Sequence, residues 1–180
     1  MPPAADDLRI RPVAADDLAA ITAIYRHAVL HGTASFEIEP PSEAEMRRRY
    51  DALLQGGHPY LVATTGDELL GYAYAGPYRP RAAYRSTVED SIYLAPGAQG
   101  RGLGRRLLQA LIEAATEAGF RQMIGVIGDS QHQASIRLHA SLGFRPVGIF
   151  EKVGWKHGRW IDSVLMQRPL GDGMSTPPSL

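Results

Sequence analysis

The chain has 180 residues, of which 44% are hydrophobic and 21% charged, and its formal net charge is zero with a pI near 7.0. These values indicate one soluble globular domain, and they argue against a dedicated nucleic-acid binder, which carries a basic excess. The lack of cysteine excludes disulfides, thiolate metal sites and cysteine nucleophiles. No apolar run reaches the ~18–20 residues of a membrane span and no signal-peptide pattern is present, so we expect a cytoplasmic protein.

Hydrophobic periodicity and turn residues predict eleven elements in the order β-α-α-β-β-β-α-β-α-β-β. Ser42 followed by Glu45 is a capping-box pattern that starts the second helix, and Gly119 is a typical residue for the end of the third helix. The predicted elements cover residues 8–13, 16–31, 43–54, 59–65, 69–78, 86–94, 103–118, 121–128, 133–142, 144–151 and 159–167.

This order favours a single α/β domain at residues 8–170, whose sheet combines antiparallel hairpins with parallel crossovers. Residues 1–7 are predicted to be a loose N-terminus. The composition of residues 171–180 predicts a disordered tail. The chain shows no internal repeat and no linker that would divide it.

Three glycines, Gly100, Gly102 and Gly104, stand between a predicted strand and the helix that starts at 103. Glycine allows positive φ and a close approach of a ligand, and successive N–H groups at a helix start can bind an anion. Arg101 and Arg105 crowd the same turn, where a cation is unfavourable unless an anion offsets it. We interpret the pattern as a phosphate site; the alternative is a glycine-shaped turn with solvated arginines. Neither the Walker loop nor the dinucleotide fingerprint matches.

The stretch "QGRGLG" at residues 99–104 resembles the Q/R-x-x-G-x-G/A motif of the GCN5-related N-acetyltransferase (GNAT) superfamily. The stretches "TASFE", "YAYAGPYRPRAAYRSTVEDSIYL", "SIRLHASLGF" and "WKHGRW" resemble its phosphinothricin/methionine sulfoximine N-acetyltransferase branch, over residues 8–170. The resemblance implies the α/β fold of this superfamily, with a twisted, mostly antiparallel sheet that is splayed beside strand 87–94 to admit acetyl-CoA. It implies coenzyme A contacts at Ile92, Tyr93, Leu94, Gln99, Gly100, Arg101, Gly102, Leu103, Gly104, Arg105, His132 and Ser135.

Glu89 is the candidate general base for deprotonating the acceptor amine. A carboxylate inside a strand is unusual, and burial would raise its pKa toward a useful value. The resemblance also places a catalytic glutamate here. The alternative is a glutamate that pairs with a nearby arginine. Strand alternation turns Asp90 to the opposite face, so Asp90 is the weaker candidate.

His139 is the candidate acid that returns a proton to the coenzyme A sulfur. The superfamily often carries a tyrosine at this place, and this branch resembles the pattern with histidine instead. Imidazole can donate a proton near neutral pH. The alternative is a packed helix histidine with one satisfied hydrogen bond. The resemblance assigns the oxyanion donor to a backbone N–H near Tyr93 or Leu94.

The loop before Glu89 interleaves arginines with tyrosines, and guanidinium groups match carboxylate and phosphinate oxygens in geometry. The resemblance implies that this loop binds the anionic ends of the substrate while Phe36 lines the pocket. Arg79 and Arg81 are favoured over Arg85. A solvated loop is the alternative. The expected substrate-binding residues are Phe36, Tyr78, Arg79, Arg81, Tyr84 and Glu89.

Two positions depart from the branch pattern: His132 stands where asparagine usually contacts the pantetheine arm, and Leu108 stands where some phosphinothricin enzymes carry tyrosine. His27 and His31 have i, i+4 spacing but lack a third ligand, so we expect no metal. The serines lack a G-x-S-x-G elbow, which argues against a serine hydrolase.

The expected function is therefore transfer of the acetyl group of acetyl-CoA to the amine of a small anionic amino acid, such as phosphinothricin or methionine sulfoximine, by direct attack. The alternatives are a protein or peptide acetyltransferase and a non-catalytic acyl-CoA-binding module. The resemblance also implies a homodimer and a link to herbicide resistance.

Overall fold

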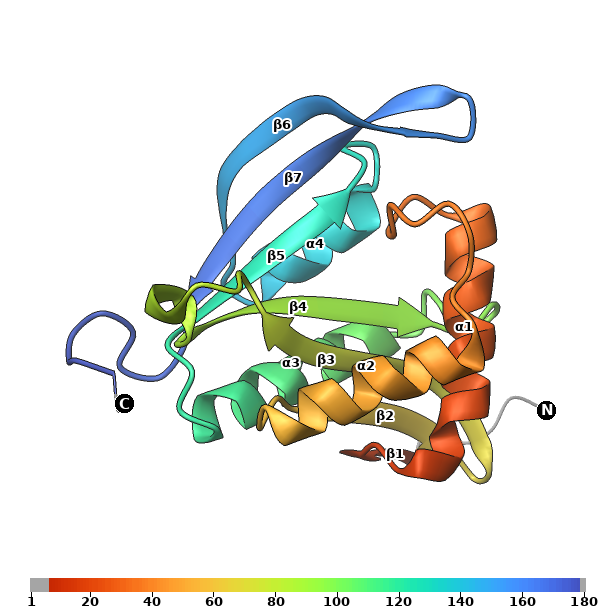
Figure 1. The fold of residues 1–180 in the computed structure, drawn as a ribbon, viewed down its shortest axis with the longest axis horizontal. Helices are drawn as coiled ribbons and strands as arrows, with labels where there is room; N and C mark the ends of the chain where they lie inside the picture. Colours follow the sequence, from red (N-terminus) through yellow and green to blue (C-terminus); the bar gives the residue numbers. More distant parts are fainter. Residues whose placement is uncertain (1–6, 179–180) are drawn as a thin grey trace.

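The computed structural model describes residues 7–178 and contains a seven-stranded sheet in the order β1-β2-β3-β4-β5-β7-β6 (Figure 1). The strands are β1 (Leu8–Pro12), β2 (Tyr60–Thr65), β3 (Glu68–Pro77), β4 (Thr87–Leu94), β5 (Gln122–Gly128), β6 (Arg145–Lys156) and β7 (Arg159–Pro169). The helices are α1 (Leu18–His31), α2 (Glu43–Gln55), α3 (Leu103–Glu117) and α4 (Gln133–Ser141), with short 3₁₀ turns at Ala15–Asp17 and Ala82–Tyr84.

The sheet is mixed but mostly antiparallel, which confirms the predicted fold class. The one parallel pair among the described strands is β4 with β5, and it spans only four residue pairs, from Thr87↔Gln122 to Asp90↔Gly125. Beyond Asp90, β4 stays paired with β3 as far as Leu94, while β5 continues beside β7. The two strands therefore part in the middle of the sheet.

Helices cover both faces of the sheet. Strand β2 is buried almost throughout, and its alternate residues belong to two different cores. Val62 packs with Ile21 of α1 and Met46 of α2, whereas Ala63 packs with Leu107 of α3. Helix α4 contributes to the same core as α3 and contacts β5 and β6. Figure 1 shows α1 and α2 in front of the sheet and α3 and α4 behind it.

Local signals explain where the helices begin and end. The Ser42 hydroxyl accepts a hydrogen bond from the Glu45 amide at 3.2 Å, as the capping-box pattern predicts for the start of α2. Gly119 follows α3 with φ of +88°, a left-handed conformation that glycine adopts without strain. The predicted first helix instead opens with a 3₁₀ turn, and its α-helical part begins at Leu18.

Two regions differ from the sequence-based expectation. Strand β6 was predicted to end at 151 but continues to Lys156. At two register shifts, residues of β6 are left without a partner in β7, and the pairing resumes beyond them. The tail predicted to be disordered begins with turns at residues 171–174, and the Arg121 guanidinium donates to the carbonyls of Gly173 and Thr176. Residues 179–180, and all of the predicted loose N-terminus except Asp7, lie outside the described residues. Within 7–178, no helix is long and apolar enough to cross a membrane.

Candidate active site

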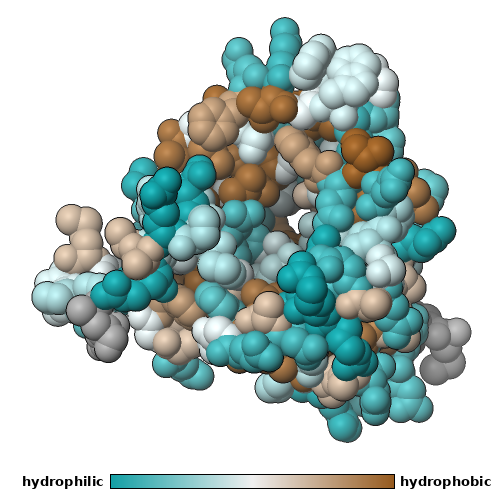
Figure 2. Space-filling view, in the orientation of Figure 1, coloured by the Kyte–Doolittle hydropathy of each residue, from teal (hydrophilic) through white to brown (hydrophobic). Residues whose placement is uncertain are grey.

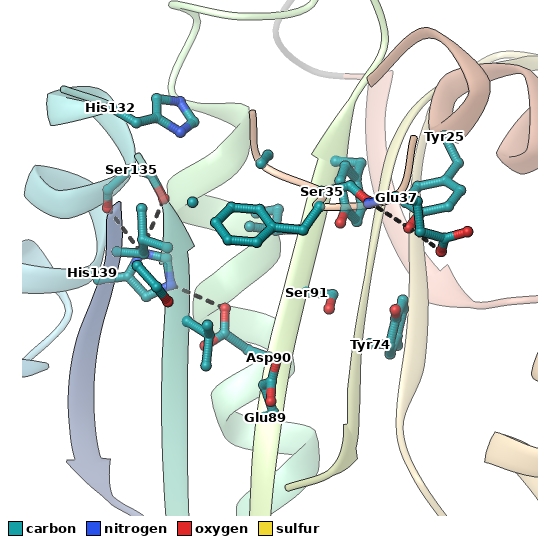
Figure 3. A pocket seen from close by; sticks show the side chains of 18 residues that line it. Tyr25, Ser35, Glu37, Tyr74, Glu89, Asp90, Ser91, His132, Ser135 and His139 are labelled. Atoms are coloured by element: carbon teal, nitrogen blue, oxygen red, sulfur yellow. Dashed lines mark hydrogen bonds and ion pairs between the residues drawn. The ribbon is translucent and has the colours of Figure 1, made fainter. Parts of the chain in front are cut away.

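The parting of β4 and β5 opens a cavity of about 470 Å³ in the centre of the molecule. Its wall comes from α1, β3, β4, β5, α4, β7 and the segment 34–37 (Figure 3). Peptide groups on the edge of β4 that faces β5 lose their strand partner beyond Asp90, so they are available to a ligand. The lining residues are Tyr25, Ala34, Ser35, Phe36, Glu37, Tyr74, Glu89, Asp90, Ser91, Ile92, Tyr93, Val126, Ile127, Gly128, His132, Ser135, His139 and Ser163.

Glu89 lies in this wall in the middle of β4, and its side chain is half-buried. Burial raises the pKa of its carboxyl to about 7, and the neighbouring charge of Asp90 adds to the rise, while the charge of Arg79 opposes it. A carboxyl with that pKa is half ionised at neutral pH, where it can accept and release a proton.

His139 of α4 is buried, and both of its ring nitrogens face protein oxygens (Figure 3). Its Nδ1 lies 2.8 Å from the Ser135 carbonyl oxygen, and its Nε2 lies 3.0 Å from Oδ2 of Asp90. Burial lowers the pKa of His139, but Asp90 and the Ser135 carbonyl raise it more, so that it lies above its ordinary value. The ring is therefore held as an imidazolium that donates to both oxygens.

Gly125 of β5 makes room for this pair. A Cβ atom at Gly125 would lie 3.0 Å from Cδ2 of His139 and 3.4 Å from Oδ1 of Asp90. Asp90 and Gly125 are also the last residues that join β4 to β5. The pair therefore lies at the point where the two strands separate.

The opposite side of the cavity carries a hydrogen-bonded network around Glu37 (Figure 3). The Tyr25 hydroxyl donates to Oε1 of Glu37 at 2.7 Å and lies 2.9 Å from Oγ of Ser35. Arg49 donates to the same carboxylate at 2.6 Å. Burial raises the pKa of Glu37, but the hydrogen bonds from Arg49 and Tyr25 lower that pKa by a larger amount. The net pKa lies below the ordinary value, so this carboxyl stays ionised.

The glycine-rich turn lies between β4 and α3. Gly100 and Gly102 both have φ of +74°, and a Cβ atom at either position would meet no atom within 4 Å. Gly102 caps α3 without a side-chain hydrogen bond, so the first N–H groups of this helix are open to a ligand. Arg105 points elsewhere: its Nη1 lies 2.6 Å from Oγ and 3.2 Å from the carbonyl oxygen of Ser141, at the end of α4.

The arginine loop does not line the cavity in this structure. Its two tyrosines pack edge to face with 5.6 Å between ring centroids, and the Arg79 guanidinium lies over Tyr78 at 5.1 Å. These contacts hold the aromatic rings to one another, and Arg81 is exposed. The loop residues therefore lie outside the cavity wall, although the sequence predicted an arginine-lined pocket. They are Tyr78, Arg79, Arg81 and Tyr84.

The structure brings seven of the predicted site residues to the cavity: Phe36, Glu89, Ile92, Tyr93, His132, Ser135 and His139. Leu94 and residues 99–105 lie outside its wall, as the end of β4 and the adjoining turn. Sequence reasoning missed Tyr25, Glu37 and Tyr74. Tyr25 shares the apolar face of its helix, so only the folded contact with Glu37 reveals its polar role.

The described residues contain no group of three or more metal-ligating side chains. The His27 and His31 rings lie 4.6 Å apart on α1, without such a third ligand.

Comparisons with known proteins found similar sequences and a similar fold. Phosphinothricin N-acetyltransferase of Alcaligenes faecalis is 56% identical over 169 residues, which cover 94% of this chain and 86% of that protein. The L-methionine sulfoximine/L-methionine sulfone acetyltransferase of Pseudomonas aeruginosa is 42% identical, with coverage of 93% and 98%. A crystal structure of a GNAT superfamily phosphinothricin acetyltransferase from Sinorhizobium meliloti in complex with AcCoA has a TM-score of 0.93 at 49% identity, with coverage of 96% and 94%.

The sequence model of the Acetyltransferase (GNAT) family matches residues 22–144, which include the glycine-rich turn and most of the cavity wall. The resemblance indicated by the sequence motifs is confirmed. The chain belongs to the GNAT family of acetyltransferases.

Proposed function

We propose that this protein is an N-acetyltransferase that moves the acetyl group of acetyl-CoA to the amine of a small amino acid of the phosphinothricin and methionine sulfoximine type. The names of the relatives support this acceptor class. The observation that carries the proposal is Glu89, a half-buried carboxyl with a pKa of about 7 in the wall of the central cavity.

The acetyl-CoA site fits the parting of β4 and β5. The open amides at the start of α3, next to Gly100 and Gly102, suit the pyrophosphate, and the exposed Arg101 adds a cation. The pantetheine arm would follow the free edge of β4 toward Leu94 and reach His132 and Ser135 across the cavity. Gln99, Leu103, Gly104 and Arg105 complete the proposed contact set. The bond from Arg105 to Ser141 gives it a second role, in joining α3 to α4.

In the reaction, Glu89 takes one proton from the acceptor ammonium, directly or through a water molecule, and leaves a free amine. The amine nitrogen attacks the thioester carbon, and the carbonyl oxygen becomes an oxyanion. Backbone N–H groups of β4 near Tyr93 or Leu94 donate to that oxyanion. Collapse breaks the carbon–sulfur bond and forms the amide, and the nitrogen releases its second proton to water. The sulfur takes one proton, for which His139 is the proposed source, and the solvent then returns a proton to His139.

The acceptor's anionic groups would meet the arginine loop at the cavity entrance. Arg79 and Arg81 are the proposed partners, with Tyr78 and Tyr84 beside them and Phe36 against the acceptor's carbon chain. The charge of Arg79 reaches Glu89, where it opposes the rise in pKa caused by burial, which supports this placement.

A panel of acceptors tests the proposal. Acetyl-CoA consumption is measured with phosphinothricin, methionine sulfoximine, methionine sulfone and a lysine peptide, at equal enzyme concentration. We expect turnover with at least one of the amino acids and little with the peptide. Turnover with the peptide alone would overturn the assignment in favour of a protein acetyltransferase, and binding without any turnover would indicate an acyl-CoA-binding module.

We also propose a homodimer formed through the outer face of the β6–β7 hairpin. Hydrophobic side chains gather over this hairpin in Figure 2. Six large hydrophobic residues of β6 and β7 are each more than half exposed, and an exposed apolar patch of this kind is typical of an interface. They are Val147, Ile149, Phe150, Val153, Trp155 and Trp160.

Sedimentation at micromolar concentration tests the dimer. The wild type should sediment with twice the mass of one chain. Ile149→Asp should sediment with the mass of one chain and remain folded. A monomeric wild type would contradict the proposal.

We place the protein in the cytoplasm. We also expect its expression in a sensitive host to raise tolerance to phosphinothricin herbicide, and a growth assay with Glu89→Gln as the control measures this effect.

A further inference from the structure

The segment 32–37, here called the acceptor segment, forms one side of the cavity without belonging to a helix or strand. Its residues Ala34 to Glu37 all line the cavity. It passes close over β5: a Cβ atom at Gly128 would collide with the Thr33 carbonyl oxygen. An irregular segment owes its position to the groups that hold it from outside.

The tip of the β6–β7 hairpin holds this segment at three points. Lys156 donates from Nζ to the Ser35 carbonyl oxygen at 2.7 Å. His157 donates from Nε2 to the Gly32 carbonyl oxygen at 3.1 Å. The ring of Phe36 packs on Gly154, where a Cβ atom would lie 2.6 Å from Cε2 of the ring.

Lys156 is the buried member of this group, with 5% of its surface exposed at the end of β6. Burying an ammonium group costs free energy unless a partner compensates for it. Burial lowers the pKa of Lys156, and the charge of Glu37 opposes that change. Lys152, on the same strand, is exposed. The position of Lys156 is therefore tied to the acceptor segment rather than to solvent.

We propose that Lys156 is a positioning residue for the acceptor: its buried ammonium fixes the backbone of the acceptor segment, so that Phe36 and Glu37 keep their places in the cavity wall. This inference rests on the proposed function, because it assigns the acceptor to this side of the cavity. Lys156 does not line the cavity, so it acts through the segment and not by touching the substrate.

Lys156→Met tests the proposal, with Lys152→Met as the matched control. Met replaces the ammonium by an apolar group of similar length and leaves the Ser35 carbonyl without its donor. With phosphinothricin as the acceptor, we expect Lys156→Met to raise the acceptor KM about tenfold, the usual scale for one hydrogen bond to a charged group. The kcat value and the Kd of acetyl-CoA should stay near wild type, and Lys152→Met should change none of the three.

Hydrogen exchange supplies a readout that needs no turnover. The amides of 33–37 should exchange faster in Lys156→Met than in Lys152→Met, while those of α3 keep their rates. If the wild type acetylates no amino acid, the proposed function fails, and the exchange result still decides whether Lys156 holds the segment.

Gly154→Ala disturbs the acceptor segment at a second contact, that with Phe36. It tests the positioning role of the hairpin tip if Lys156→Met does not fold. The added methyl group would displace the Phe36 ring, and we expect a raised acceptor KM with unchanged acetyl-CoA binding. An unchanged acceptor KM in the variants that fold would overturn the proposal. A loss of acetyl-CoA binding equal to the loss of acceptor binding would overturn it as well, because it would indicate a general structural role.

Discussion

The imidazole of His139 and the carboxylate of Asp90 form a buried ion pair, with 3.0 Å between Nε2 and Oδ2, where β4 and β5 part. Asp90 lies next to Glu89 in the strand, so the residue that holds the proposed acid also raises the pKa of the proposed base, in addition to the larger effect of burial. The other carboxylate oxygen of Asp90, Oδ1, has no hydrogen-bond partner among the described residues. The pair thus joins β4 to α4 and links both proposed proton-transfer groups.

The pair should make stability depend on pH. Burial lowers the pKa of His139, but Asp90 and the Ser135 carbonyl raise it to a net value above that of the unfolded chain. The stabilisation is therefore fully present below the unfolded pKa of about 6.5 and is lost as pH rises through the folded value. We expect His139→Gln to lower the free energy of unfolding by about 3 kcal/mol at pH 6 and by less at pH 9.

Urea unfolding at both pH values measures this difference. His27→Gln, which removes an exposed histidine of α1, serves as the control and should show the same small effect at each pH. An effect of His139→Gln that does not change with pH would contradict a charged His139.

Glu89→Gln should separate catalysis from stability. We expect kcat/KM to fall by about 10²-fold or more, the usual scale for a general base, and the acid limb of the pH–rate profile near pH 7 to disappear. The raised pKa means that the wild type loses stability as pH rises through about 7, because the buried carboxyl ionises.

The same variant should therefore unfold at a higher urea concentration than wild type at pH 8. We expect a gain of about 1 kcal/mol at that pH, after allowance for solvent screening of a half-buried group, and little gain near pH 4. Glu68→Gln, on the exposed start of β3, controls for loss of a carboxylate. An active Glu89→Gln enzyme would remove Glu89 from its proposed role.

Gly102→Val should weaken acetyl-CoA binding beyond its effect on folding. Valine at φ of +74° is strained by about 1–2 kcal/mol, and its side chain would also stand in front of the open amides of α3. Gly119→Val imposes similar strain at φ of +88° at the other end of α3. We expect similar losses of stability, with the Kd of acetyl-CoA raised at least about tenfold only in Gly102→Val, as titration calorimetry would measure. Equal Kd values in the two variants would refute the phosphate site.

Gly125→Ala should disturb the Asp90–His139 pair. The added methyl group would lie 3.0 Å from the imidazole, and relief of that contact requires the ring or the strand to move. We expect a loss of about 1–3 kcal/mol in the free energy of unfolding and a lower kcat. Gly148→Ala, where a Cβ atom would meet nothing within 4 Å, is the matched control. A fully active Gly125→Ala enzyme would show that the exact place of His139 is unimportant.

Most of the fold could be predicted because its signals are local. Capping at Ser42, the glycine after α3 and strand alternation depend on residues close in the chain, and they located the elements within a few residues. The end of β6 could not be predicted, because two register shifts and the left-handed Lys152 carry the strand past its apparent stop. These features follow from pairing with β7.

The site was harder to predict because its contacts are distant in sequence. Alternation separated Asp90 from Glu89, but nothing local indicates a partner 49 positions away in α4. The same holds for Glu37, whose partners Tyr25 and Arg49 come from two different helices. The sequence before β4 showed that the loop carries arginines, but it did not show where their side chains point. That direction depends on how Tyr78 packs with Tyr84.

The short ladder between β4 and β5 also has a mechanical consequence. Four residue pairs form the seam between a plate made of β1 to β4 and a plate made of β5, β7 and β6. A ligand in the gap beyond that seam touches both plates, so its binding free energy opposes their separation. Acetyl-CoA should therefore slow amide exchange in β5 and α4 as much as in the turn that holds it, and the ligand would replace the strand pairing that the sheet lacks there.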